Sequence, residues 1–138
     1  MSYIKKIFNY TKEYPSTEYS FKARYPYIKR LEEAENNLKK YKNEKIPVII
    51  ETDGNLELGR IKNNKYIIPK ELTVGHMMVI LKEKILEIDE KNSILIYVGS
   101  SKILEIPKSS ETIERLYEKY QDEDKFLYLK ISILETYG

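Results

Sequence analysis

The chain has 138 residues, enough for one domain that buries its own apolar core without disulfides or a structural metal. It has no cysteine and one histidine, and it shows neither a catalytic triad nor a glycine-rich phosphate loop, so we expect neither an enzyme nor a metal or cofactor site. Its 24 basic and 22 acidic residues give a net charge of +2, too close to neutral to indicate nucleic acid as a partner.

Residues 1–20 are predicted to form an extension, and residues 21–138 a single domain. Apolar residues between Tyr3 and Phe8 recur at helical spacing among lysines, which is typical of a basic amphipathic helix that touches a membrane or a partner. The break at Pro15 and the polar run after it fit a mobile tail equally well. The sequence therefore leaves two interpretations of the extension open.

A helix is predicted over residues 27–41 and a strand over residues 46–51. The helix has an apolar stripe, expected to face the core, and a charged face expected in solvent. The strand is predicted from its β-branched, apolar run, and Asp53-Gly54 marks a turn after it. The apolar stripe of the helix consists of Ile28, Leu31, Ala34, Leu38 and Tyr41.

The strand Lys65–Ile68 and the helix after it form the region around which the rest of the chain is interpreted. The asparagines before this strand and Pro69 at its end predict a short edge strand. In the helix, Met77 and Ile80 lie beside the expected core stripe and extend its apolar surface. An edge strand flanked by apolar surface suits an added peptide strand, although these residues could simply be core. The expected core stripe consists of Val74, Met78, Leu81 and Ile85.

The last part of the chain predicts strands over residues 94–98 and 103–106, a helix over residues 111–121, and a strand over residues 125–133. Ser109 or Ser110 is expected to cap the helix. One face of the final strand is expected in the core, and the other to expose Phe126 and Tyr128. This order of elements predicts an α+β fold of the β-grasp, or ubiquitin-like, type.

Several short segments match one known family in order and at nearly its spacing. They are Phe21-Lys22 with Tyr25-Pro26, residues 46–49, residues 65–69, residues 72–75, Leu116-Tyr117, residues 123–128 and the terminal Tyr137-Gly138. From about residue 21 to its end the chain resembles the autophagy ubiquitin-like modifiers, the family of GABA-receptor-associated protein. The resemblance implies a ubiquitin-like core with additional N-terminal helices.

The resemblance also implies two apolar pockets that flank the strand at residues 65–69. Receptors and adaptors of the family bring an aromatic residue and, three positions later, an aliphatic one, and this motif pairs as an added strand. Lys45 and Lys84, together with Lys65, are expected to attract acidic residues around the motif. The aromatic pocket is expected to consist of Glu33, Leu38, Pro47, Ile49, Lys65, Ile67 and Phe126. The aliphatic pocket is expected to consist of Tyr66, Ile68, Pro69, Leu72, Met77 and Ile80.

The resemblance further implies a covalent function for the terminal glycine. In the family, the carboxylate that corresponds to Gly138 is adenylated, passed as a thioester to cysteines of activating and conjugating enzymes, and joined to phosphatidylethanolamine. A cysteine protease that trims or delipidates the protein is a further implied partner. The unlipidated chain is expected to be a cytoplasmic monomer, and the lipidated chain to be anchored on autophagosomal membranes.

The chain departs from the family pattern at several positions. Lys125 replaces a usual aromatic residue, and His76 replaces a usual glutamine, which would remove a capping partner of Thr73. A linker one residue longer leaves open whether Asn37 or Leu38 lines the aromatic pocket, and the periodicity favours Leu38. The sequence does not decide between the autophagic modifier, a noncovalent adaptor in vesicle trafficking, and a lipidated factor of another organelle membrane.

Overall fold

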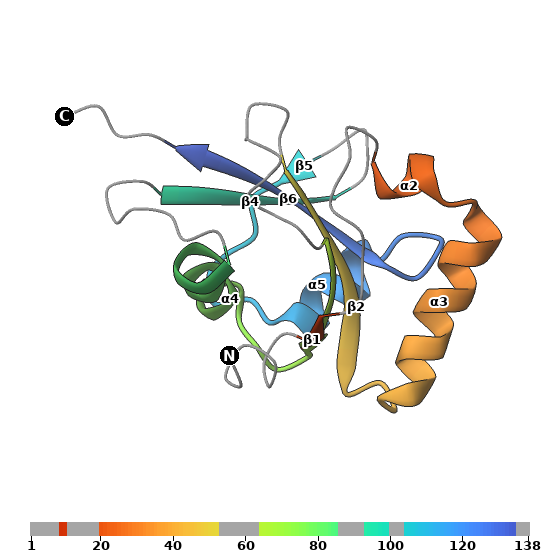
Figure 1. Cartoon of the computed structure of the whole chain (residues 1–138). Coiled ribbons are helices and arrows are strands. Elements are labelled where there is room, and N and C mark those ends of the chain that lie inside the picture. The colour runs from red at the N-terminus through yellow and green to blue at the C-terminus, as the bar shows by residue number, and fades with distance from the viewer. Residues whose placement is uncertain (1–8, 11–19, 53–63, 86–92, 100–103, 135–138) are drawn as a thin grey trace.

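A mixed β-sheet forms the middle layer of the computed structural model, which describes residues 9–10, 20–52, 64–85, 93–99 and 104–134 (Figure 1). Within these residues the strand order is β1-β3-β2-β6-β4-β5. The central pair β2–β6 is parallel, and the other neighbouring pairs are antiparallel. The strands are β1 (Asn9–Tyr10), β2 (Lys45–Thr52), β3 (Lys65–Pro69), β4 (Ser93–Gly99), β5 (Leu104–Glu105) and β6 (Leu127–Leu134).

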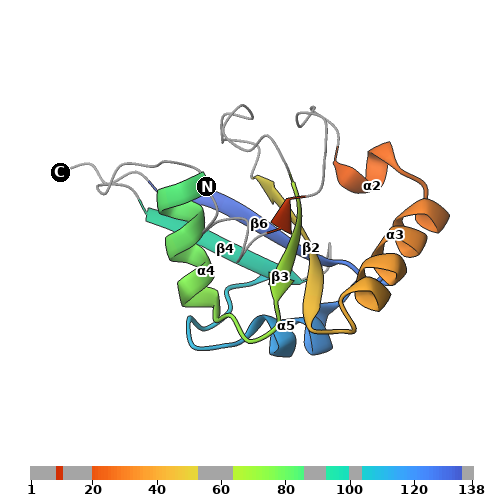
Figure 2. The same ribbon diagram turned by 60° about the horizontal axis from the view of Figure 1, so that its bottom comes forward.

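Helices cover both faces of the sheet. On one face lie α2 (Phe21–Arg24) and α3 (Tyr27–Lys40), which are separated by Pro26. On the other lie α4 (Val74–Ile80), continued by a π-helical turn (Leu81–Ile85), and α5 (Ile113–Tyr120) (Figure 2). The predicted helices and strands thus exist in the expected order, and α2 agrees with the additional N-terminal helices that the resemblance implies. Strand β1, within the predicted extension, was not expected.

The main core lies between the sheet and the pair α4 and α5. Alternate residues of β2, β4 and β6 point into it, as period-2 alternation requires. Leu127, Leu129 and Ile131 are at most 1% exposed, which confirms the predicted inner face of the last strand. The buried members of this core are Ile46, Val48, Ile50, Tyr66, Ile68, Val74, Met77, Ile80, Leu81, Ile94, Ile96, Val98, Ile113, Leu116, Leu127, Leu129 and Ile131.

A second, smaller core lies on the other face, under α2 and α3. Phe21, Ala34, Ile49 and Phe126 are its buried members, and Tyr25 and Tyr128 pack against them. The rings of Phe21 and Phe126 meet edge to face with centroids 5.3 Å apart. The expectation that Phe126 is exposed is therefore wrong, because α2 and α3 cover the face of β6 that an uncovered sheet would present to water.

The two expected helix faces are only partly confirmed. In α3, Ala34 is fully buried and three further residues of the stripe are partly buried, but Ile28 is 67% exposed, and Arg30 turns toward the buried Asp124 instead. In α4, Met77 and Ile80 are buried in the main core, whereas Met78 is only partly buried, so the expectation of surplus apolar surface at Met77 and Ile80 is wrong.

Threonines, not serines, begin the helices on the main-core side. Thr73 Oγ1 accepts a hydrogen bond from His76 N, and Thr112 Oγ1 accepts one from Arg115 N, each at 3.2 Å. The predicted cap at Ser109 or Ser110 is therefore wrong by two or three residues. The two caps also pair with each other, since Thr73 and Thr112 form an antiparallel bridge that fixes the starts of α4 and α5 side by side.

Candidate functional site

The outer edge of β3 lies where the two helical layers meet the sheet. On one side of the strand, Tyr66 and Ile68 enter the main core together with residues of α4. On the other side, Lys65 reaches Glu33 of α3. Because successive side chains of a strand point to opposite faces, β3 presents two chemically different surfaces on either side of one edge.

The backbone of β3 shows which of its groups face that edge. Antiparallel pairs alternate between hydrogen-bonded and non-bonded residue pairs. Ile50 N donates to Asn64 O at 2.8 Å, and in the same register Val48 lies opposite Tyr66. The bonded pairs with β2 therefore involve residues 64, 66 and 68 of the β3 side, and the N–H and C=O groups of Lys65 and Ile67 point to the outer edge.

The residues predicted for the aromatic pocket come together between α3 and the sheet. Lys65 Nζ lies 3.0 Å from the Glu33 carboxylate, and the side chains are 13% and 36% exposed. Leu38 is partly buried on the same helix, whereas Asn37 is a partly buried neighbour whose carbonyl accepts from Tyr41 N. The remaining four are buried, so they form a floor rather than an open cavity. These four are Pro47, Ile49, Ile67 and Phe126.

The residues predicted for the aliphatic pocket come together between β3 and α4. Pro69 and Leu72 are partly buried, and Leu72 packs on the main core. The other four are 0–3% exposed and belong to that core, so the partly exposed pair would meet a ligand first. The four buried residues are Tyr66, Ile68, Met77 and Ile80.

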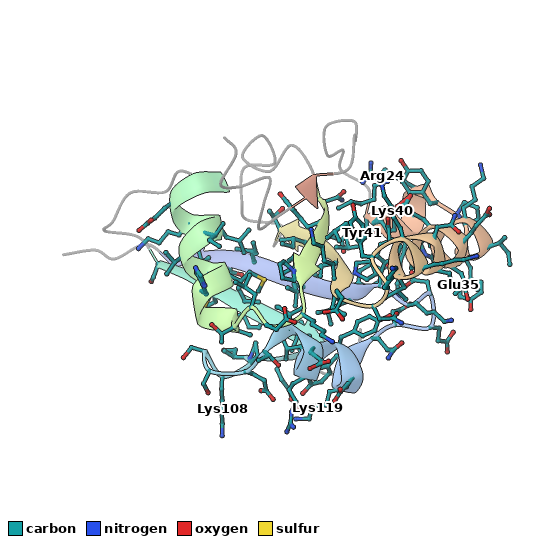
Figure 3. The ribbon with its side chains drawn as sticks, turned by 90° about the horizontal axis from the view of Figure 1, so that it is seen from below. Arg24, Glu35, Lys40, Tyr41, Lys108 and Lys119 are labelled. Carbon is teal, nitrogen blue, oxygen red and sulfur yellow. The ribbon has the colours of Figure 1, made fainter. Side chains whose placement is uncertain are left out.

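Of the basic residues predicted to flank the site, the structure describes the Lys45 side chain. Its Nζ lies 5.1 Å from the centroid of the Tyr41 ring, and Figure 3 labels Tyr41 just after α3. The side chain of Lys84 and the whole of Gly138 lie outside the described residues. Lys45 thus lies at the start of β2, opposite Pro69 at the end of β3.

An acidic residue that was not among the predicted site residues, Asp124, holds the second core together. Asp124 is fully buried, and its Oδ2 accepts from Arg30 Nε at 2.8 Å and from the Tyr128 hydroxyl at 2.5 Å. Its Oδ1 accepts from Phe126 N at 2.9 Å. Arg30 also donates from Nη1 to the carbonyl of Tyr25 at 2.7 Å. Asp124 therefore ties α3 and the residue after α2 to the start of β6.

The tyrosines around Asp124 predict how stability changes at alkaline pH. Burial, followed by the negative charge of Asp124, raises the pKa of Tyr117 to about 12. Burial, followed by the hydrogen bond to Asp124, raises the pKa of Tyr128 as well. Because these folded-state pKa values exceed the ordinary value of 10.0, their stabilising contribution is complete below pH 10 and is lost as the pH rises through the folded values.

We accordingly expect the free energy of unfolding to fall as the pH rises from about 10 to about 12. Urea unfolding across this range measures the slope, and ultraviolet absorbance follows tyrosine ionisation. Tyr117→Phe should make the decline shallower. An unchanged slope in this variant, with all tyrosines of the folded chain ionising together near pH 10, would contradict the expectation.

Two grooves lie near α2. One, of about 400 Å³, lies along α2 and α3, and its lining includes Glu33 of the predicted aromatic pocket and Asn37, the alternative to Leu38 in that pocket. The other, of about 440 Å³, lies between α2 and the sheet and includes Lys22, Glu51 and Tyr97. Neither groove joins the two surfaces of β3, so the edge of this strand remains the candidate site.

The described residues contain neither a membrane-spanning helix nor a metal-binding cluster. In these ranges no helix combines the length and the apolar character needed to cross a membrane. Across the same part of the chain, no group of three or more histidine, aspartate or glutamate side chains is arranged to hold a metal ion.

Known proteins resemble the chain in sequence and in fold. The family model described as "Autophagy protein Atg8 ubiquitin like" matches residues 29–138. Autophagy-related protein 8h of Arabidopsis thaliana is 33% identical over 119 residues, which cover 86% of this chain and 95% of that protein. Autophagy-related protein 8 of Candida glabrata is 33% identical over 119 residues, covering 86% and 96% of the two chains.

Two solved structures share the fold with a TM-score of 0.71 each. Trypanosoma brucei ATG8 is 25% identical, and the match covers 88% of this chain and all of that one. Plasmodium falciparum Atg8, solved in complex with a Plasmodium falciparum Atg3 peptide, is 27% identical, with 84% and 99% of the two chains covered. These matches confirm the expected ubiquitin-like α+β fold.

Proposed function

The chain belongs to the Atg8 family of ubiquitin-like autophagy proteins, and on that premise we propose that it is a covalent membrane tag that recruits receptors. Proteins of this family are modifiers and adaptors, so the chain is not an enzyme. In the proposed role, Gly138 is joined to phosphatidylethanolamine on autophagosomal membranes, and β3 binds receptors with aromatic-x-x-aliphatic motifs. Cytoplasmic before conjugation, the chain becomes membrane-anchored after it.

The observation that supports receptor binding best is the position of the β3 edge between α3 and α4. An extended peptide that adds a strand there would pair with the outward backbone groups of Lys65 and Ile67. Its side chains would alternate between the α3 surface and the α4 surface. An aromatic residue and an aliphatic residue three positions apart lie at odd spacing, so they would reach opposite sides of β3.

The partly exposed residues would make the first contacts with such a peptide. On the α3 side these are Glu33, Leu38 and Lys65, and on the α4 side they are Pro69 and Leu72. The buried residues beneath them form a packed floor, so small shifts of side chains would be needed to admit the aromatic ring. Because ordering a flexible peptide costs free energy, which offsets part of the gain from its contacts, we expect it to bind with roughly micromolar affinity.

Lys45 offers a prediction about the acidic flank of the motif. Lys45→Ala should weaken a peptide with acidic residues beside the motif about two- to fivefold at low salt, and less at high salt. Because the chain has no tryptophan, the emission of a tryptophan in the peptide reports binding directly. Lys119→Ala is the matched control, since Lys119 projects from α5 away from the sheet (Figure 3). Equal weakening by both variants would contradict a local role of Lys45.

The covalent step follows the chemistry of a carboxylate. With ATP, the Gly138 carboxylate would form an acyl-adenylate and release pyrophosphate. A cysteine thiol of the activating enzyme would displace AMP to give a thioester, which passes to the conjugating enzyme. The amine of phosphatidylethanolamine would then attack the carbonyl, forming an amide and releasing the thiol. Glycine suits this step because it has no Cβ to obstruct approach in a narrow channel.

Reconstitution tests the proposal. The chain would be incubated with cognate activating and conjugating enzymes, ATP and vesicles that contain phosphatidylethanolamine, beside a variant that lacks Gly138. We expect the mass to increase by one lipid, minus water, in the full chain and not in the deletion variant. If the enzymes conjugate another Atg8 protein but leave this chain unmodified, the covalent function fails and a noncovalent adaptor becomes the better account.

A further inference from the structure

The outer edge of β3 already has a partner within this chain. Strand β1 pairs antiparallel with β3, with Asn9 opposite Ile67 and Tyr10 opposite Tyr66 (Figure 2). In the described part of the sheet, β1 is therefore the terminal strand and β3 is not. The prediction of β3 as an edge strand is wrong in this respect, because the chain supplies an additional strand from its own N-terminal extension.

The position of β1 coincides with that of the proposed receptor strand. The N–H and C=O groups of Ile67 point away from β2, toward the side on which Asn9 lies. Pro69 has no N–H, so the outward donors of β3 are those of Lys65 and Ile67. One edge of a strand pairs with one neighbour at a time. A peptide that pairs with Ile67 must therefore first displace Asn9.

The short β1 strand is suited to reversible binding. It pairs at only two residues, which is too little to hold firmly by itself. Phe21 is buried in the second core, so the short segment of residues 11–20 tethers β1 to a fixed point. A tether of this length keeps a weak strand at a high effective concentration near its site.

We propose, on the basis of the receptor-binding function above, that β1 is an autoinhibitory strand that occupies the β3 edge until a receptor motif displaces it. The N-terminal extension would then set the apparent affinity for receptors. If only a fraction of molecules has a free edge, the apparent affinity is reduced by that fraction. Peptides whose motifs bind the β3 edge tightly would displace β1, whereas peptides with low affinity would not.

The test compares the affinity of one tryptophan-containing motif peptide for the full chain and for a variant that lacks residues 1–12. Loss of β1 should tighten binding about three- to tenfold. A full-length pair provides the matched comparison: Asn9→Pro removes the backbone donor opposite Ile67, whereas Asn9→Ala retains it. We expect tighter binding for Asn9→Pro and wild-type affinity for Asn9→Ala.

Hydrogen exchange at the Ile67 amide gives a readout that does not depend on the peptide. Exchange should be slow in the wild type and fast in the Asn9→Pro and deletion variants, with the rest of the sheet unchanged. Equal peptide affinity for all four proteins would overturn autoinhibition and leave receptor binding intact. Absence of binding to every protein, including the deletion variant, would overturn both the proposed receptor function and the autoinhibitory role.

Discussion

Asp124→Ala is expected to lower the free energy of unfolding by about 3–5 kcal/mol, because it leaves a buried cation without its counterion. The Arg30 side chain is 11% exposed and Asp124 is fully buried, so water cannot replace the lost carboxylate at low cost. The Tyr128 hydroxyl and the Phe126 N–H lose their acceptor in the same substitution. Because the network joins α3 to β6, we expect α2 and α3 to detach first.

Urea unfolding followed by circular dichroism measures this loss. Glu123→Ala is the control, since Glu123 is the exposed neighbour of Asp124 and should change stability by less than about 0.5 kcal/mol. The double variant Arg30→Met with Asp124→Ala should recover part of the loss, because it removes the stranded charge. Equal stability of the Asp124→Ala and Glu123→Ala variants would show that the buried pair does not hold the helices.

Phe126→Ala is expected to destabilise the fold by about 3–5 kcal/mol, since it removes a buried ring from a small core. Phe126 is 1% exposed and meets the ring of Phe21 edge to face. Although it belongs to the predicted aromatic pocket, its alanine variant would lose peptide binding through loss of structure. It is therefore unsuitable as a selective probe of receptor binding.

Thermal unfolding together with peptide titration separates the two effects. Phe126→Leu is the matched variant, because it keeps most of the buried volume and should cost less than about 1.5 kcal/mol. We expect the melting temperature to fall strongly for Phe126→Ala and slightly for Phe126→Leu. If Phe126→Ala kept its melting temperature and lost only peptide binding, Phe126 would line an open pocket instead of a packed core.

The sequence was sufficient to predict the elements whose patterns are local. The β-branched run of β2 and the alternation of Leu127, Leu129 and Ile131 in β6 each specify a strand with one buried face. The helix of residues 27–40 follows from apolar spacing and from Pro26 before it. Sequence and structure agree on these elements because their patterns depend on neighbouring residues alone.

Features that depend on distant contacts could not be predicted in this way. Residues at neighbouring angles of a helix differ little in pattern, so identifying Met77 rather than Met78 as the buried core residue needed the position of the sheet. Arg30 and Asp124 are 94 positions apart, and each has the charge typical of a solvated surface. The pairing of Asn9 with Ile67 likewise joins residues with no local signal.

The candidate site was predicted by resemblance more than by physical pattern. The structure brings Lys65 of β3 together with the predicted residues of α3 on one side of the strand, and Tyr66 and Ile68 together with those of α4 on the other. Their roles in binding remain predictions, as do the roles of Gly138 and of the Lys84 side chain, which lie outside the described part of the chain. The boundary between the extension and the domain at residue 20 is likewise a proposal, although α2 begins at Phe21.

A titration of the isotope-labelled full chain with an aromatic-x-x-aliphatic peptide tests the central claim most directly, with amide chemical shifts as the measurement. We predict the largest changes at Lys65 and Ile67, with smaller ones in α3 near Glu33 and in the segment from Pro69 to α4. Saturable changes confined to α5, or to the groove between α2 and α3, would contradict the β3 edge as the receptor site.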